Sequence, residues 1–134
     1  MLKLSKKTEY ALMAVKYIAL KPENSCVTAK EISLGYNIPY ELLAKILQKL
    51  TKKNIIISYQ GIKGGYSLVK NSKDITLNDV VAAIEKVQIT NCMKENGSTR
   101  DCARFDCCQI RNPLSKVQLE IEKVFKETTI SQIL

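Results

Sequence analysis

The chain has 134 residues, including five cysteines and no histidine, and its formal net charge at pH 7 is +8. Hydrophobic residues make up 46% of it, which is enough for a folded core and excludes an intrinsically disordered chain. No apolar run approaches the roughly 18 residues that span a bilayer, and the first residues lack the apolar stretch of a signal peptide. We therefore expect one compact cytoplasmic domain with no membrane partner and with reduced thiols.

The positive charge is concentrated in the first half of the chain. Residues 1–70 hold 12 lysines against 4 glutamates, a net charge of +8, whereas residues 71–134 hold nine basic and nine acidic residues. A solvated lysine-rich surface would explain a basic protein in general. Binding to a polyanion requires clustered cations, so the asymmetry favours a nucleic-acid partner.

Three helices are predicted in the first half of the chain. Apolar residues at helical spacing predict a helix over residues 8–20. Thr28 and Glu31 form a capping box that begins a short second helix, and Gly35 is suited to end it. A third helix is expected over residues 39–53. Two helices joined by such a tight turn predict a helix–turn–helix.

A glycine-rich β-hairpin is predicted directly after these helices. Residues 55–59 and 66–69 are rich in strand-forming residues, and they flank a turn that contains three glycines and Lys63. In isolation this is an ordinary hairpin. After a helix–turn–helix, a hairpin with a basic tip indicates a wing that reaches the minor groove or the DNA backbone.

The second half of the chain predicts two helices separated by a loop. Thr76 and Asp79 form a second capping box, which begins a helix expected to run through Val87. Residues 90–113 lose helical periodicity and carry four cysteines, so a loop is predicted there. The helix expected over 114–126 has a narrow apolar stripe, formed by Leu114, Val117, Ile121 and Val124.

The stripe favours a homodimer interface over packing against the chain's own core. The predicted fold class is therefore mainly α with a small β-hairpin wing. Residues 1–75 form the winged helix–turn–helix DNA-binding region. Residues 76–134 carry the cysteine loop (90–113) and a long C-terminal dimerisation helix, within one compact domain overall.

This architecture predicts which residues contact double-stranded DNA. Pro39 is expected at the first position of the recognition helix, with Tyr40 and Glu41 near the end that reaches base edges. Two roles are open for Glu41. Its carboxylate accepts a hydrogen bond from a cytosine amino group, or it stabilises the N-terminal end of the helix dipole. Lysines are better placed for phosphates. The full predicted set is Lys3, Lys6, Lys7, Thr28, Pro39, Tyr40, Glu41, Lys45, Lys49, Gln60, Gly61, Lys63 and Gly64.

Four cysteines, Cys92, Cys102, Cys107 and Cys108, form the second candidate site. In a reduced compartment they favour metal ligands or redox thiols over disulfides. The residues leave three interpretations open: an iron–sulfur cluster, a structural zinc site, or thiols that oxidise. Cys26 is expected to be a small core residue.

The sequence does not predict an enzyme. It contains no histidine and no glycine-rich phosphate loop before a helix.

The chain resembles the iron–sulfur-cluster regulator family of winged helix–turn–helix transcription factors, the IscR/NsrR/RirA/CymR type. The resemblance covers nearly the whole chain, and the wing motif is its most specific part. Besides the cysteine loop, it is carried by residues 8–12 (TEYAL), 28–32 (TAKEI), 38–43 (IPYELL), 61–68 (GIKGGYSL) and 75–80 (ITLNDV).

The resemblance implies a homodimeric transcription regulator, expected to be a repressor, that binds a palindromic operator. It implies sensing of iron, redox state or nitric oxide through a labile iron–sulfur cluster, with 2Fe–2S favoured over 4Fe–4S. Cys92, Cys102 and Cys108 match the three cysteine-ligand positions of the family. Glu9 matches the carboxylate that some members supply from the first helix, and Cys107 is the alternative ligand.

One residue of the wing departs from the family pattern. Many members have arginine before the first wing glycine, where this chain has Gln60. Glutamine pairs with adenine edges but cannot form the charged fork of arginine with guanine.

The alternative to a cluster-sensing regulator is a regulator of the same fold that is controlled by thiol oxidation or by a partner protein. A zinc-stabilised DNA-binding protein is the other alternative.

Overall fold

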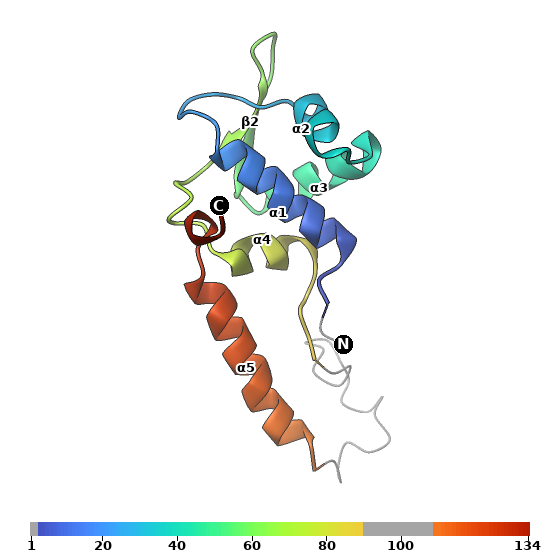
Figure 1. Ribbon diagram of the computed structural model, residues 1–134, viewed down its shortest axis with the longest axis vertical. Helices are drawn as coiled ribbons and strands as arrows, with labels where there is room; N and C mark the ends of the chain where they lie inside the picture. Colours follow the sequence, from blue (N-terminus) through green and yellow to red (C-terminus); the bar gives the residue numbers. More distant parts are fainter. Residues whose placement is uncertain (1–2, 90–108) are drawn as a thin grey trace.

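The computed structural model describes residues 3–89 and 109–134 (Figure 1). Its helices and strands are α1 (Lys6–Ala19), α2 (Ala29–Tyr36), α3 (Tyr40–Lys52), β1 (Ile56–Tyr59), β2 (Gly65–Leu68), α4 (Leu77–Ile84), α5 (Arg111–Glu127) and a short 3-10 helix (Ile130–Ile133). Within the described residues no helix is long and apolar enough to cross a membrane.

The first three helices form one packed unit with the hairpin and α4. Helix α3 has its apolar residues on one face, and Leu43, Ile46, Leu47 and Leu50 are all buried there. Helix α1 packs against α3 and α4, and it also contacts β2. It begins two residues earlier than predicted, because the Ser5 side chain accepts a hydrogen bond from the Thr8 backbone N–H at 3.2 Å.

The turn between α2 and α3 is built differently from the prediction. Gly35 lies inside α2, and a Cβ there would lie 3.3 Å from Cε2 of Tyr17, so this glycine allows α2 to approach α1 closely. The residue that ends α2 is Asn37, whose φ of 53° is left-handed. Pro39 is the N-cap of α3 rather than its first helical residue.

The hairpin is antiparallel, with a register that runs from Ile56 opposite Leu68 to Tyr59 opposite Gly65. Val27 extends the sheet, because its backbone N–H and C=O bond to Tyr66 at 2.9 and 2.7 Å. The hairpin projects from the helices at one end of the molecule (Figure 1). The predicted fold class, a mainly α winged helix–turn–helix with a long C-terminal helix, is confirmed.

Two helix boundaries in the second half of the chain differ from the prediction. Helix α4 keeps its capping box at Thr76 but ends at Ile84, before Val87, because Glu85 has an extended backbone with φ −151° and ψ 167°. Helix α5 begins at Arg111, three residues before the predicted Leu114.

Helix α5 extends away from the rest of the molecule toward the end opposite the hairpin (Figure 1). Its C-terminal end is attached to the segment before α4. The Leu77 N–H bonds to the Thr128 carbonyl at 2.7 Å, and the Ile130 N–H bonds to the Ile75 carbonyl at 2.8 Å. Ile130 is itself buried in the core, so the chain after α5 is part of the packed unit.

Candidate DNA-binding surface and thiolate site

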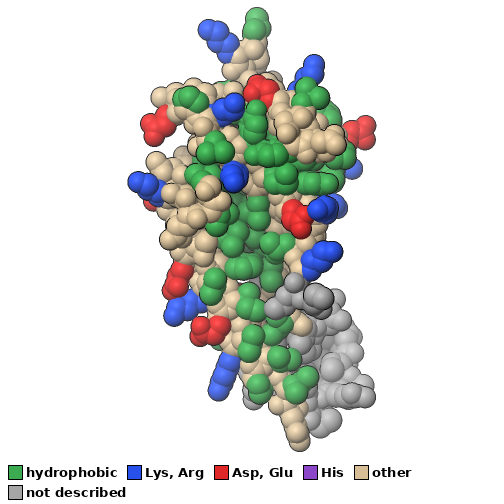
Figure 2. Space-filling view, viewed as in Figure 1, with side chains coloured by type: hydrophobic (Ala, Val, Ile, Leu, Met, Phe, Trp, Pro, Cys, Tyr) green, Lys and Arg blue, Asp and Glu red, His purple; other side chains and the backbone are tan. Residues whose placement is uncertain are grey.

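Helix α3 and the hairpin form a strongly basic stretch of the chain. Between Glu41 and Asp74 there are seven lysines and no acidic residue. Lys45 and Lys49 are exposed on the face of α3 opposite its buried leucines. Figure 2 shows lysine side chains, with a few acidic ones among them, around the hairpin end of the molecule. This surface has the clustered positive charge that phosphate binding requires.

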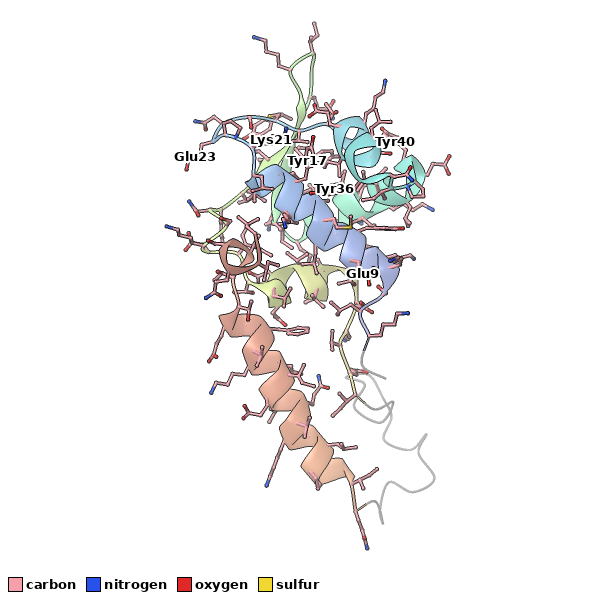
Figure 3. All side chains as sticks on the ribbon, in the orientation of Figure 1. Glu9, Tyr17, Lys21, Glu23, Tyr36 and Tyr40 are labelled. Carbon is pink, nitrogen blue, oxygen red and sulfur yellow. The ribbon has the colours of Figure 1, made fainter. Side chains whose placement is uncertain are left out.

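The N-terminal end of α3 is open to solvent. The Tyr40 side chain is 56% exposed and lies at the turn between α2 and α3 (Figure 3), and Glu41 and Pro39 are also exposed. Thr28, predicted to contact DNA, accepts the Glu31 N–H at 3.1 Å as the cap of α2. The arrangement presents Tyr40 and Glu41 at the position from which recognition helices read base edges.

The tip of the hairpin is a tight turn of restricted geometry. The Gly64 N–H bonds to the Gly61 carbonyl at 3.0 Å, and Gly61 has a φ of 111°. A Cβ at Gly64 would lie 2.4 Å from the Tyr59 carbonyl oxygen, so a larger residue cannot occupy this position. Gln60 and Lys63 are both exposed on this turn.

The three N-terminal lysines lie apart from the hairpin. Lys3, Lys6 and Lys7 are exposed at the end of α1 that is remote from the wing (Figure 1). The Lys6 ammonium forms an exposed ion pair with Glu9 at 2.7 Å, and this hydrogen bond and charge raise the pKa of Lys6. The structure therefore does not bring these lysines together with the wing.

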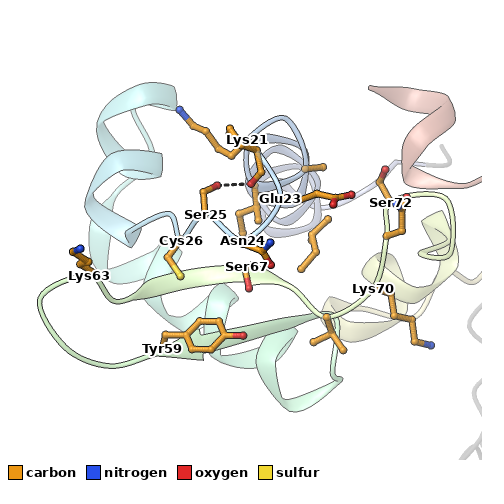
Figure 4. Close-up of a pocket in the computed structure, with 16 residues that line it drawn as sticks. Lys21, Glu23, Asn24, Ser25, Cys26, Tyr59, Lys63, Ser67, Lys70 and Ser72 are labelled. Carbon is orange, nitrogen blue, oxygen red and sulfur yellow. Dashed lines mark hydrogen bonds between the residues drawn. The ribbon is translucent and has the colours of Figure 1, made fainter.

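A shallow groove of about 560 Å³ lies between the α1–α2 loop and the hairpin (Figure 4). Lys21, Lys63 and Lys70 line it, and Cys26 lies in it half-buried. The expectation that Cys26 is a core residue is therefore wrong. The Lys21 ammonium lies 4.8 Å from the centroid of the Tyr17 ring, a cation–π contact that fixes it at the end of α1.

Glu85 forms a polar junction that the sequence analysis did not identify. One of its carboxylate oxygens accepts the Thr8 hydroxyl at 2.5 Å and the Ser5 N–H at 2.8 Å. Burial raises the pKa of Glu85, but the hydrogen bonds from Thr8 and Ser5 outweigh it and leave the pKa below its ordinary value. The junction joins the N-terminal end of α1 to the residue that ends α4.

Gln118 forms a corresponding junction on α5. Its amide nitrogen donates to the Val87 carbonyl at 2.6 Å, and its amide oxygen accepts the Ile89 N–H at 3.1 Å. Together with Glu85, these bonds attach residues 85–89 to α1 at one end and to α5 at the other. This segment leads directly toward Cys92 in the sequence.

The four predicted thiolate ligands, Cys92, Cys102, Cys107 and Cys108, lie outside the described residues. Within residues 3–89 and 109–134, no three cysteine or carboxylate side chains converge on a metal-sized site. Glu9, the predicted carboxylate ligand, lies in the first turn of α1, where its side chain is 41% exposed (Figure 3). It is engaged there in its ion pair with Lys6.

Comparison with a family model gives a match over nearly the whole chain. The Rrf2 model, described as an iron-dependent transcriptional regulator, matches residues 4–134. Among similar sequences, the transcriptional regulator NsrR of Halalkalibacterium halodurans is 27% identical over 134 residues, which cover 99% of this chain and 90% of that protein. NsrR of Oceanobacillus iheyensis is 26% identical over 132 residues, covering 98% of this chain and 88% of that protein.

Solved structures show the same fold. CymR, the global cysteine regulator of B. subtilis, superposes with a TM-score of 0.77 at 20% identity, covering 99% of this chain and 96% of that one. IscR of T. potens superposes with a TM-score of 0.73 at 23% identity, covering 98% of this chain and 85% of that one. The matches extend through the C-terminal helix, so they concern the whole architecture rather than the helix–turn–helix alone.

Proposed function

Since the chain belongs to the Rrf2 family of transcriptional regulators, we propose that it acts as a homodimeric repressor that senses through a labile iron–sulfur cluster. DNA binding rests on the basic surface formed by α3 and the wing, which belong to a stretch of the chain with seven lysines and no acidic residue between Glu41 and Asp74. Two copies related by a two-fold axis would present two recognition helices to the half-sites of a palindromic operator.

The cluster part of the proposal is supported by the chemistry of the donor set. Cys92, Cys102 and Cys108 supply three thiolates, and Glu9 or Cys107 supplies the fourth ligand. Among the residues that the structure describes, the Glu9 carboxylate pairs with Lys6 in an exposed ion pair, which costs little to break. A bound cluster would supply a redox-active centre that reacts with oxygen and nitric oxide.

The two polar junctions indicate how the loop would be coupled to DNA binding. Residues 85–89 are attached to α1 through Glu85 and to α5 through Gln118, and both attachments lie just before Cys92. Cluster binding by the cysteines that follow would set the position of this segment. The segment would in turn set the spacing of the two recognition helices, which decides whether both dock on the operator.

The alternative is a regulator of the same fold that works without a cluster. The chain is similar both to the transcriptional regulator NsrR and to the cysteine regulator CymR. These similarities are consistent with control by a cluster and with control without one. In that case the loop thiols would respond by oxidation, or a partner protein would control the dimer. A third case is a zinc ion that stabilises the loop, bound by the same thiolates.

The decisive experiment is anaerobic purification followed by visible absorption and by iron, sulfide and zinc analysis. Brown protein with equimolar iron and sulfide supports the proposal. Serine at Cys92, Cys102 or Cys108 should then abolish the colour, whereas Cys26→Ser is the matched control and should keep it. Colourless protein after reconstitution, with or without zinc, contradicts the cluster and favours one of the alternatives.

The role of the cluster in DNA binding needs a separate measurement. Holo and apo protein are titrated against the same duplex at a fixed salt concentration. The coupling proposed above predicts different affinities for the two forms. Equal affinities would contradict it, even if the cluster itself is present.

A further inference from the structure

The side chain of Ile62 projects from the tip of the wing into solvent. It is 107% exposed, more than any other large hydrophobic residue among those the structure describes. Single exposed hydrophobic residues are ordinary on protein surfaces, so exposure by itself assigns no role. The position of Ile62 within the turn is the more informative feature.

The turn gives no local reason for an isoleucine at this position. Ile62 and Lys63 are the two central residues of the turn that the Gly64 N–H closes onto the Gly61 carbonyl at 3.0 Å. Such positions favour glycine, proline, asparagine or aspartate, and a β-branched apolar residue does not stabilise them. The side chain makes no core contact to compensate.

Glycines at the tip and at the base of the wing allow the backbone to turn and approach closely. Gly64 has no room for a Cβ, since the Tyr59 carbonyl oxygen would lie 2.4 Å away. At the base of the wing, a Cβ on Gly65 would lie 2.7 Å from the Val27 carbonyl oxygen. The tip is therefore a narrow, tight turn, closed by the Gly61–Gly64 hydrogen bond, that presents Ile62 and Lys63 at its end.

The charge around the tip selects the kind of partner. Lys63 is the neighbour of Ile62, and no acidic residue occurs between Glu41 and Asp74. A cationic, apolar tip is suited to the DNA minor groove, whose walls are deoxyribose and whose rims are phosphate. Aliphatic side chains inserted there open base steps partially, and the cost depends on how deformable the step is.

Resting on the proposed function, we propose that Ile62 inserts into the operator minor groove as an apolar wedge, while Lys63 contacts the adjacent phosphates. The inserted side chain discriminates between DNA sequences by how easily a base step deforms, and not by the hydrogen-bonding groups of the bases. It therefore favours a flexible pyrimidine–purine step at the position beneath the wing. Specificity at that step comes from the protein without a hydrogen bond to any base.

The test starts from a pool of 40-base-pair duplexes with randomised centres, from which wild-type protein selects a preferred sequence. The dissociation constants of wild type, Ile62→Ala and Lys63→Ala are then measured on the selected duplex and on an unselected one, over a series of salt concentrations. Ile62 is fully exposed, so its variants should fold normally, and their thermal unfolding is checked against wild type.

Loss of the three outer carbon atoms in Ile62→Ala should weaken binding to the selected duplex by roughly tenfold. Binding to the unselected duplex and the salt dependence should not change, because no charge is removed. Ile62→Leu keeps an apolar side chain of the same volume and should restore most of the affinity. Lys63→Ala should instead reduce the slope of log affinity against log salt concentration by about 0.9 on both duplexes.

A change in the DNA completes the design. Replacing the pyrimidine–purine step beneath the wing by a stiff A-tract step should weaken wild type but have little effect on Ile62→Ala. Equal affinity of wild type and Ile62→Ala on the selected duplex would overturn the inference. If wild type selects no sequence at all, the proposed function has failed instead, and the two failures are thus distinguished.

Discussion

The two ends of the molecule differ in how they bury apolar surface. At the hairpin end, α3 buries Leu43 and Leu47 fully within the chain, and the helices and hairpin share one core. At the other end, Val117 and Val124 of α5 are 47% and 56% exposed. Among the α5 side chains that the structure describes, the one that is buried is polar, Gln118.

The difference shows which part of the fold is complete in one chain. The hairpin end has a continuous core buried within one chain, so the stability that this core provides is an intrachain property. Hydrophobic side chains along α5 remain on the surface (Figure 2), which is the composition of an interface rather than of a solvated helix. Our proposal of a homodimer through α5 follows from this contrast.

The largest effect is expected from charges placed on the apolar stripe of α5. The double variant Val117→Glu, Val124→Glu should raise the dimer dissociation constant at least hundredfold, because unpaired carboxylates would be buried in the interface. Sedimentation velocity over a range of concentrations measures this. The double variant Lys116→Glu, Lys123→Glu, at exposed positions of the same helix, is the control and should remain dimeric.

A matched pair of leucine truncations compares the two ends directly. Leu47→Ala in the core of the hairpin end should lower the free energy of unfolding by about 3 kcal/mol. Leu119→Ala, at a position 63% exposed in one chain, should change it by less than about 0.5 kcal/mol when measured in the monomeric Val117→Glu, Val124→Glu background. Similar losses for both would contradict the comparison.

DNA binding should depend on the hairpin end in a salt-dependent way. Removing two phosphate-binding charges in Lys45→Ala, Lys49→Ala should reduce the slope of log affinity against log salt by about 1.8, and affinity at low salt by one to two orders of magnitude. Fluorescence anisotropy with a labelled duplex measures both. Lys123→Ala on α5 should leave both unchanged, and an equal effect there would place the DNA elsewhere.

The smallest effect concerns the junction between the ends. Because the pKa of Glu85 is lowered on folding, its contribution to stability is present above pH 4.5, the ordinary pKa of the carboxyl, and is lost as the pH falls toward its lower folded-state pKa. Glu85→Gln should therefore cost about 1 kcal/mol at pH 7 and progressively less below pH 4.5.

Chemical denaturation across this pH range tests the prediction. Glu9→Gln, which removes an exposed ion pair, is the control and should change the free energy of unfolding by less than about 0.5 kcal/mol at pH 7. A pH-independent loss in Glu85→Gln would mean that the junction acts through packing rather than through the charge of the carboxylate.

Much of the secondary structure was predictable from short sequence patterns. The capping boxes at Thr28 and Thr76 are present as predicted, with the backbone N–H of the third helical residue bonded to the threonine hydroxyl at 3.1 Å in both. The apolar face of α3 and the hairpin between residues 55 and 69 are also confirmed. These features depend on residues three or four positions apart or on adjacent strands.

The errors arose where a residue has two uses that only its surroundings distinguish. The sequence predicts Gly35 as the residue that ends α2, but its lack of a Cβ serves the contact between α2 and Tyr17. Asn37, which takes the left-handed conformation, has the terminating role. Helix α4 ends before Val87, since Glu85 adopts an extended backbone and its carboxylate binds α1.

The sequence by itself determined the order of the helices, the wing, the basic stretch and the spacing of the cysteines, because each is a property of neighbouring residues. The tertiary structure decided the polar junctions. The carboxylate of Glu85 lies 77 residues from Thr8 along the chain, and Gln118 lies 31 residues from Val87. Such pairs form only after the path of the chain between them is fixed by burial of the core, and no local pattern in the sequence encodes that path.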